Sequence, residues 1–150
     1  MKTIFDRAVR DELIDRINSL SKYNEAQWGQ MNVYQMIKHC CIYDSWVLGK
    51  NNPKYRQTVP GRIFGKAALK SMTKDDSPVK RNMPTIKDFI VKKKDGDVEH
   101  QKKIWISLIA EYENYSNPGF IHSFFGKLTV EQTGILAYKH ADHHLRQFGA

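Results

Sequence analysis

The sequence predicts an all-α protein, a four-helix bundle with a long crossover connection between its second and third long helices. Four segments repeat apolar residues at intervals of three and four, which is typical of amphipathic helices, and alternating strand-like patterns are nearly absent. The stretch between the second and third segments is interrupted repeatedly by prolines. Such helices bury their apolar faces most simply against one another, and we expect a single domain over residues 1–150.

Local signals place the first two long helices. Residues 4–20 carry apolar side chains on one helical face, with charged residues between them. A second helix starts after Asn32, because Asn32 and Gln35 have the spacing of a capping box. We expect this helix to end near Gly49, since glycine is favoured just after a helix C-terminus.

The crossover connection comprises residues 50–94 and is the least regular part of the chain. Its prolines leave room for short helices only, which we expect over residues 62–72 and 85–93. The third long helix is predicted over residues 97–115, because an apolar stripe runs along it and an Asn-Pro-Gly sequence follows.

The last helix carries a pair of histidines with metal-ligand spacing. A loop is expected over residues 120–128, and Thr129 and Gln132 then form a second capping box at the helix start. His140 and His144 stand four residues apart, so they project from one face about one turn apart. Two imidazoles in this arrangement can bind one divalent metal ion.

His39 is the natural third ligand, because it lies beside the apolar face of the second predicted helix. If the second and last helices are neighbours, His39, His140 and His144 converge and leave coordination positions open. The alternative is that they are ordinary core histidines. His143 points about 100° away from His144, so we expect it outside the ligand set. Imidazole suits zinc, nickel, copper and iron, so the ligand type does not identify the metal.

The net charge of +8 is concentrated in residues 50–103, which hold 15 Lys or Arg and 6 Asp or Glu. Such a segment is typical of a solvated lysine-rich face, and it can also attract an anionic small molecule, nucleic acid or a membrane surface. Lysine dominates, aromatic residues are sparse and no nucleic-acid motif occurs, so we do not expect a nucleic-acid partner.

The chain lacks the signals of export and of membrane insertion. No signal-peptide core and no apolar window of about 18 residues occurs, so we expect a cytoplasmic protein without a membrane partner. Cys40 and Cys41 are adjacent, and neighbouring residues on a helix point in different directions. We therefore expect reduced, packed thiols rather than a disulfide, with a reactive thiol as the alternative.

Short motifs in both halves of the chain follow one known pattern, and they cover about residues 28–148. They are Trp28-Gly29 with Met31, Gln35-Met36 with His39, and the C-terminal series His140, His143, His144, Arg146 and Gln147. This pattern resembles the DinB/YfiT-like superfamily of metal-dependent enzymes. The segment from Phe125 to Gln132, together with the C-terminal series, is similar to an uncharacterised bacterial subgroup of it.

The resemblance implies a four-helix bundle, often a homodimer, that acts on a small-molecule substrate. It also implies a divalent metal, commonly nickel or zinc, at positions that match His39, His140 and His144. Characterised members include transferases that join a low-molecular-weight thiol to an electrophile. A metal ion can activate either a thiol or a water molecule, so thiol transfer and hydrolysis are both open.

Two other classes of function stay open. The histidines can belong to a non-catalytic metal-binding or interaction module, for which we expect a site closed by protein ligands. The basic segment 50–103 can bind nucleic acid or an anionic surface, in which case the affinity should fall steeply with salt. Three aromatic residues, Tyr34, Trp46 and Tyr138, either line a substrate pocket or pack in the core.

Overall fold

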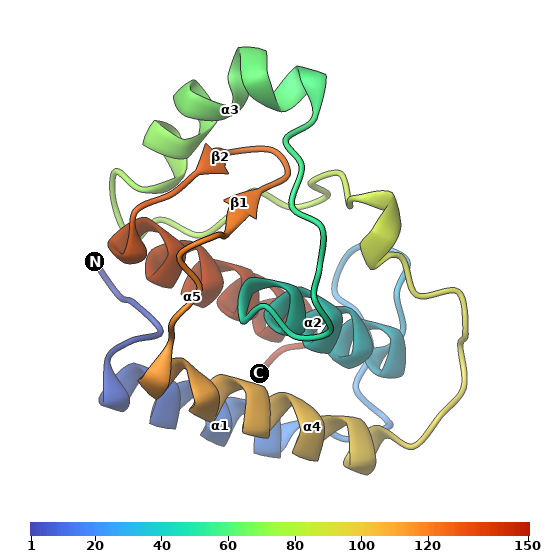
Figure 1. The fold of residues 1–150 in the computed structure, drawn as a ribbon. Coiled ribbons are helices and arrows are strands. Elements are labelled where there is room, and N and C mark those ends of the chain that lie inside the picture. Colours follow the sequence, from blue (N-terminus) through green and yellow to red (C-terminus); the bar gives the residue numbers. More distant parts are fainter.

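The computed structural model describes residues 1–150 and contains five helices and one small β-hairpin (Figure 1). The helices are α1 (Arg7–Ser19), α2 (Val33–Val47), α3 (Val59–Met72), α4 (Val98–Glu111) and α5 (Val130–Gln147). Single turns of 3-10 helix occur at Lys87–Phe89 and Tyr112–Asn114. None of the helices is long and apolar enough to cross a lipid bilayer.

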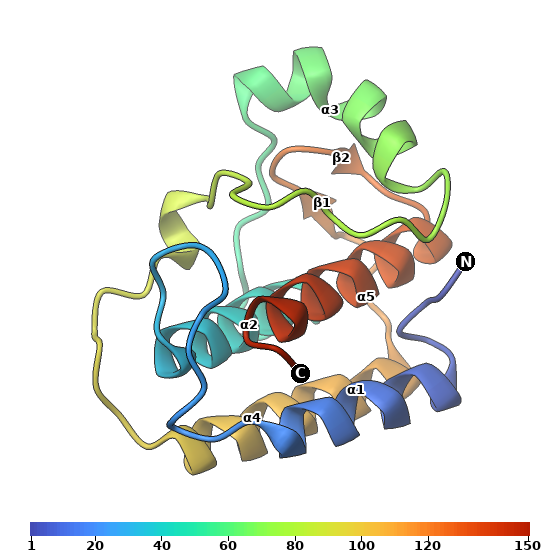
Figure 2. The same cartoon turned by 180° about the vertical axis from the view of Figure 1, so that it is seen from behind.

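Helices α1, α2, α4 and α5 form the predicted four-helix bundle. α2 contacts α4 and α5, and α1 contacts the same two helices. Figures 1 and 2 show α1 and α4 side by side in one layer, with α2 and α5 in a second layer beside it. α3 and the hairpin lie beyond the α2–α5 layer, on the side away from α1 and α4.

Large apolar side chains from all four helices meet in the core. Those with almost no exposed surface include Leu13, Ile17, Met36, Ile37, Trp105, Ile109 and Leu145. The core also holds a carboxyl group, because Asp44 of α2 is only 1% exposed. The indole of Trp105 and the hydroxyl of Tyr112 donate hydrogen bonds to its two oxygens, at 2.9 and 2.8 Å. These bonds tie α2 to the middle of α4 and to the turn that follows it.

Both predicted capping boxes are present and set the starts of α2 and α5. The pairs are Asn32 with Gln35 and Thr129 with Gln132. The first helix begins at Arg7, later than expected, because the preceding segment packs against α5.

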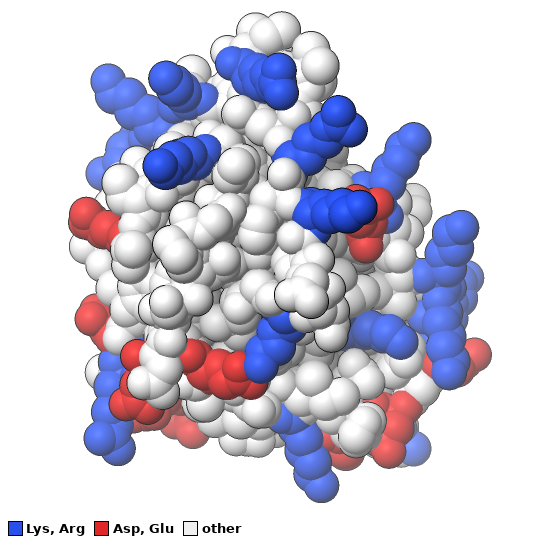
Figure 3. All heavy atoms as spheres, in the orientation of Figure 1, with Lys and Arg blue, Asp and Glu red and all other residues white.

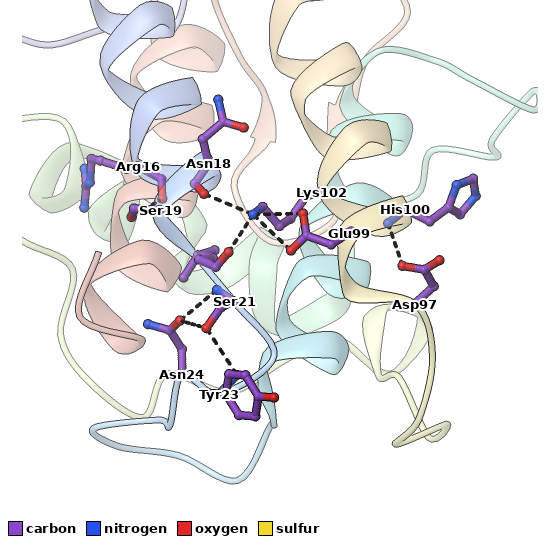
Figure 4. Close-up of polar contacts among 11 residues, drawn as sticks. Arg16, Asn18, Ser19, Ser21, Tyr23, Asn24, Asp97, Glu99, His100 and Lys102 are labelled. Atoms are coloured by element: carbon purple, nitrogen blue, oxygen red, sulfur yellow. Dashed lines mark hydrogen bonds and ion pairs between the residues drawn. The ribbon is translucent and has the colours of Figure 1, made fainter.

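A buried lysine closes the other end of α1 (Figure 4). Lys102 of α4 is 6% exposed, and its ammonium group donates to the backbone oxygens of Asn18 and Leu20 at 3.0 and 2.5 Å. Carbonyl groups at a helix C-terminus lack partners within the helix, and a cation is favourable there. Lys102 therefore joins α4 to α1 through its charge as well as its stem.

The crossover contains α3, which starts three residues earlier than expected, and little other regular structure. The expected helix over residues 85–93 is wrong: only Lys87–Phe89 forms a 3-10 turn, because Ile86 and Ile90 on either side are extended. Polar side chains of the bundle hold the crossover in place through its backbone. Lys139 of α5, for example, donates to the carbonyl oxygens of Asp75 and Ser77.

The segment expected as a loop before α5 forms a hairpin. Its strands β1 (Ile121–His122) and β2 (Gly126–Lys127) pair in antiparallel fashion. α3 lies directly on the turn, because Gly61 and Gly65 face the backbone of Phe124, where a Cβ atom at either position would overlap the Phe124 carbonyl oxygen. The two glycines therefore set how closely α3 approaches the hairpin.

Candidate metal centre

Three histidine side chains meet where α2 packs against α5. His39 belongs to α2, whereas His140 and His144 lie one turn apart on α5. One ligand nitrogen from each lies within 4.8 Å of the other two, and the Nε2 atoms of His39 and His140 are 3.0 Å apart. The fold thus brings together the three candidate ligands that the sequence predicts.

A backbone carbonyl of the crossover orients His39. The Nδ1 atom of His39 lies 2.9 Å from the oxygen of Phe89. Because a carbonyl oxygen can only accept a hydrogen bond, Nδ1 carries the proton and Nε2 presents its lone pair to the cluster. The sequence could not predict this contact, because every residue type has a backbone carbonyl and none is marked as the acceptor.

A side-chain amide orients His144 in the same way. The Nδ1 atom of His144 lies 2.9 Å from Oε1 of Gln147, while Nε2 of Gln147 donates to the backbone oxygen of Trp28 at 2.7 Å. The second bond fixes which end of the amide faces His144, so Nδ1 is the donor and Nε2 is free. Gly29 has a positive φ of 81°, and a Cβ there would lie 2.6 Å from Gln147 Nε2. The Trp28-Gly29 motif is therefore the docking point of Gln147.

His140 has no such support within the protein. Its Nδ1 atom is buried without a hydrogen-bond partner, and the ring of Tyr43 stacks on it at 3.8 Å. If Nε2 carries the proton, it donates to His39 and leaves Nδ1 an unsatisfied acceptor. If Nδ1 carries it, the Nε2 lone pairs of His39 and His140 face each other. A metal cation that binds both lone pairs would remove the repulsion in this second arrangement.

The distance between two of the nitrogens is close to that of two ligands on one divalent metal ion. Nitrogen ligands at about 2.0–2.1 Å in tetrahedral geometry are roughly 3.3 Å apart. The 3.0 Å between the Nε2 atoms of His39 and His140 is close to this value. The cluster contains no cysteine and no carboxylate, so three neutral ligands would leave a bound dication its full charge.

Burial keeps the three imidazoles in their neutral, metal-binding form. It lowers the pKa of His144 to about 3 and that of His140 well below the usual value, and the neighbouring histidines lower both further. Burial also lowers the pKa of His39, against the opposing effect of its bond to Phe89. At neutral pH a metal ion would therefore meet little competition from protons.

Three other predicted positions lie outside the cluster. The ring of His143 packs in a T-shaped arrangement against the ring of Trp28, with the two centroids 5.7 Å apart, as its offset along the helix suggests. Both cysteines are free and buried. Burial raises the pKa of Cys41 to about 12 and that of Cys40 well above the usual value, so both are packed thiols rather than nucleophiles.

Sequence reasoning missed His122, a fourth histidine near the cluster. It is buried in β1, with its ring 5.3 Å from that of Trp46. Its Nδ1 accepts hydrogen bonds from the backbone amides of Phe124 and Phe125, so its proton lies on Nε2. Burial lowers the pKa of His122 to about 4. A lone histidine in a presumed loop carries no spacing signal that could have revealed it.

An aromatic layer made of Tyr43, Trp46 and Phe89 covers one side of the histidines. The Tyr43 ring lies 6.0 Å from each of the other two, and Phe89 also packs edge-on against His39. Trp46 and Phe89 line a cavity of about 660 Å³, which we call the crossover cavity, together with Pro53, Lys54, Arg56, Gln57, Thr58, Val59, Arg62, Ile86, Asp88 and Ser123.

Of the three aromatic residues predicted to line a pocket or pack in the core, only Trp46 lines this cavity. Tyr34 and Tyr138 are both buried in the core cluster, and Tyr34 also lines a more open hollow beside residues 22–33. Trp46 therefore lines a pocket, Tyr138 packs in the core, and Tyr34 does both.

Comparison with known proteins gives a family but no activity. The sequence profile of DUF1569, a family described as proteins of unknown function, matches residues 5–150. Neither the curated proteins nor the solved structures gave a match. The profile match spans nearly the whole chain, including all three histidines of the cluster. The chain therefore belongs to the DUF1569 family, which is grouped with the DinB/YfiT-like metal-dependent hydrolases.

Proposed function

We propose that this protein is a metal-dependent enzyme that binds one divalent cation through the Nε2 atoms of His39, His140 and His144. The observation that carries the proposal is the convergence of three neutral imidazoles, two of which donate from Nδ1 to a fixed acceptor. Hydrogen bonds of this kind orient metal-binding histidines and set the nitrogen that binds. Zinc and nickel are the ions we propose, since imidazole suits both.

A three-ligand site supports an enzyme better than a closed, non-catalytic module. No fourth histidine, cysteine or carboxylate joins the three imidazoles. When bound, the cation would supply a Lewis acid that lowers the pKa of a water molecule or a thiol. The protein would hold the three rings, and the aromatic layer would keep bulk water from one side of them.

We propose a small molecule as the substrate and a water molecule or a low-molecular-weight thiol as the nucleophile. The grouping of DUF1569 with metal-dependent hydrolases supports water. The sequence resemblance to the DinB/YfiT-like superfamily, whose characterised members include thiol transferases, supports a thiol. Both nucleophiles need the same open coordination position, so the histidine geometry serves either reaction.

Metal analysis tests the ligand set. Protein purified without a metal-affinity tag should contain about one zinc or nickel ion per chain, measured by inductively coupled plasma mass spectrometry. His39→Ala, His140→Ala and His144→Ala should each lose most of the metal, whereas the control His143→Ala should keep it. Far-ultraviolet circular dichroism should show that each variant is folded. Full metal content in folded His140→Ala protein would refute the proposed ligands.

Cobalt substitution tests the open position and distinguishes the two nucleophiles. Protein loaded with Co²⁺ should change its visible spectrum when 2-mercaptoethanol is added, with a new thiolate-to-metal band if a thiol binds. A pH-dependent spectrum that is insensitive to the thiol would support water instead. A spectrum unchanged by thiol, azide and pH would indicate a closed site and would contradict the enzyme proposal.

A further inference from the structure

We propose that the crossover cavity binds the anionic group of the substrate, a carboxylate or a phosphate attached to an apolar or aromatic body. The cavity of about 660 Å³ has the size of a small-molecule site. This inference deepens the proposed function, because it assigns the ligand of the cavity as the substrate of the histidine centre.

Three cationic side chains face the cavity without an internal counter-ion. Lys54, Arg56 and Arg62 all line it, and none of them belongs to an ion pair of the structure. Asp88 is the only acidic residue of the lining. Figure 3 shows Lys and Arg side chains gathered over the part of the molecule where α3 lies, with acidic side chains mostly over the opposite part. Cations around a concave site attract anions more strongly than the same charges on a flat surface.

The start of α3 forms part of the same wall. Thr58 caps this helix, Val59 is its first residue, and both line the cavity. The first turn contains no acidic residue, so the positive end of the helix dipole is not neutralised from within. The hydroxyl oxygen of Ser123, which also lines the cavity, is buried without a hydrogen-bond partner.

Another part of the cavity wall is apolar, and it is also in contact with the histidine centre. Phe89 holds His39 through its backbone oxygen and lines the cavity. The Trp46 ring packs edge-on against that of Phe89 at 5.2 Å, and Tyr43 links both to His140 by stacking. One aromatic layer thus lies between the two sites, so an anion held by the arginines would place an attached body against this layer, whose rings contact His39 and His140.

Ligand titration monitored at Trp46 tests the proposal directly. Phenyl phosphate and benzoate should shift the indole ¹⁵N–H resonance of Trp46, assigned with Trp46→Phe, whereas the neutral analogue benzyl alcohol should not. Arg56→Gln and Arg62→Gln should each weaken phenyl phosphate binding about tenfold, because each removes a charge-assisted hydrogen bond. Lys66→Gln is the matched control, since Lys66 is exposed on α3 outside the cavity.

The outcomes separate this inference from the proposed function. Binding of phenyl phosphate should persist in His140→Ala protein, even when that variant has lost its metal. Equal losses of phenyl phosphate affinity in Arg62→Gln and Lys66→Gln would indicate a diffuse basic face. Binding of benzyl alcohol as tight as that of phenyl phosphate would indicate an apolar pocket. Either result would overturn the inference and leave the metal proposal standing. Absence of metal with intact anion binding would refute the proposed function and leave the anion site of the cavity standing.

Discussion

The Nε2 atoms of His39 and His140 lie 3.0 Å apart, although the two histidines are 101 positions apart in the chain. α2 supplies two neighbours of the His140 ring, because Tyr43, one turn after His39, stacks on that ring. A shift of α2 along α5 would therefore separate the Nε2 atoms of His39 and His140, and it would also remove Tyr43 from the His140 ring. The geometry of the centre depends on the packing of these two helices.

Gln147→Leu should weaken metal binding without unfolding the protein. Leucine keeps the buried volume of Gln147, but it removes the acceptor of His144 Nδ1 and the donor to Trp28. His144 would then lose the bond that fixes its ring and its tautomer. Loss of such an outer contact typically lowers metal affinity about 10–100-fold. Competition with a chromophoric zinc chelator measures the affinity.

The neighbouring exposed residue provides the control for this change. Arg146 lies on the same turn of α5 as Gln147 and is exposed, so Arg146→Gln should keep the zinc affinity of the wild type. Thermal melts of both metal-free variants show whether the fold is intact. An unchanged affinity in Gln147→Leu would mean that His144 is held by packing alone.

Asp44 should make the protein less stable as the pH rises toward neutrality. Burial raises the pKa of Asp44 from 3.8 to about 7. Between these values the folded protein keeps a proton that the unfolded chain has released, so the free energy of unfolding falls as the pH rises. From about pH 5 to pH 8, the wild type should lose about 3 kcal/mol relative to Asp44→Asn.

The asparagine variant isolates the titration of Asp44. Its amide oxygen can accept the bond from Trp105, and the Tyr112 hydroxyl can turn to accept from the amide nitrogen, so both contacts survive. Urea denaturation of metal-free protein at each pH measures the free energy of unfolding. Parallel pH profiles for the wild type and Asp44→Asn would show that this carboxyl does not titrate in the window.

Lys102→Met should destabilise the protein by about 2 kcal/mol, because it leaves two carbonyl oxygens at the end of α1 without their charged donor. Methionine preserves most of the packing of the lysine stem. Urea denaturation at constant pH measures the loss, and hydrogen exchange should show faster opening at residues 17–20. The exposed Lys103→Met serves as the control, and an equal loss in both variants would contradict the capping role of Lys102.

Local patterns were sufficient for the long helices and for two of the three histidines of the centre. The capping boxes at Asn32 and Thr129 depend on residues three positions apart, and the His140–His144 pair depends on the helical repeat. These relationships are decided within one turn of backbone, so they can be read from the chain. The hairpin could not be predicted, because its strands of two residues each are defined by their pairing and by contact with α3.

Only the tertiary structure joins His39 to the pair on α5, directs Gln147 to the backbone of Trp28 and places the Phe89 carbonyl on His39. Each of these contacts links segments that are distant in the chain, and two of them end on backbone oxygens that any residue could offer. The sequence by itself determined which long helices form and which side chains can bind a metal. The packing of α2, α5 and the crossover decided which of those side chains meet, because convergence is a property of helix packing and not of spacing along the chain.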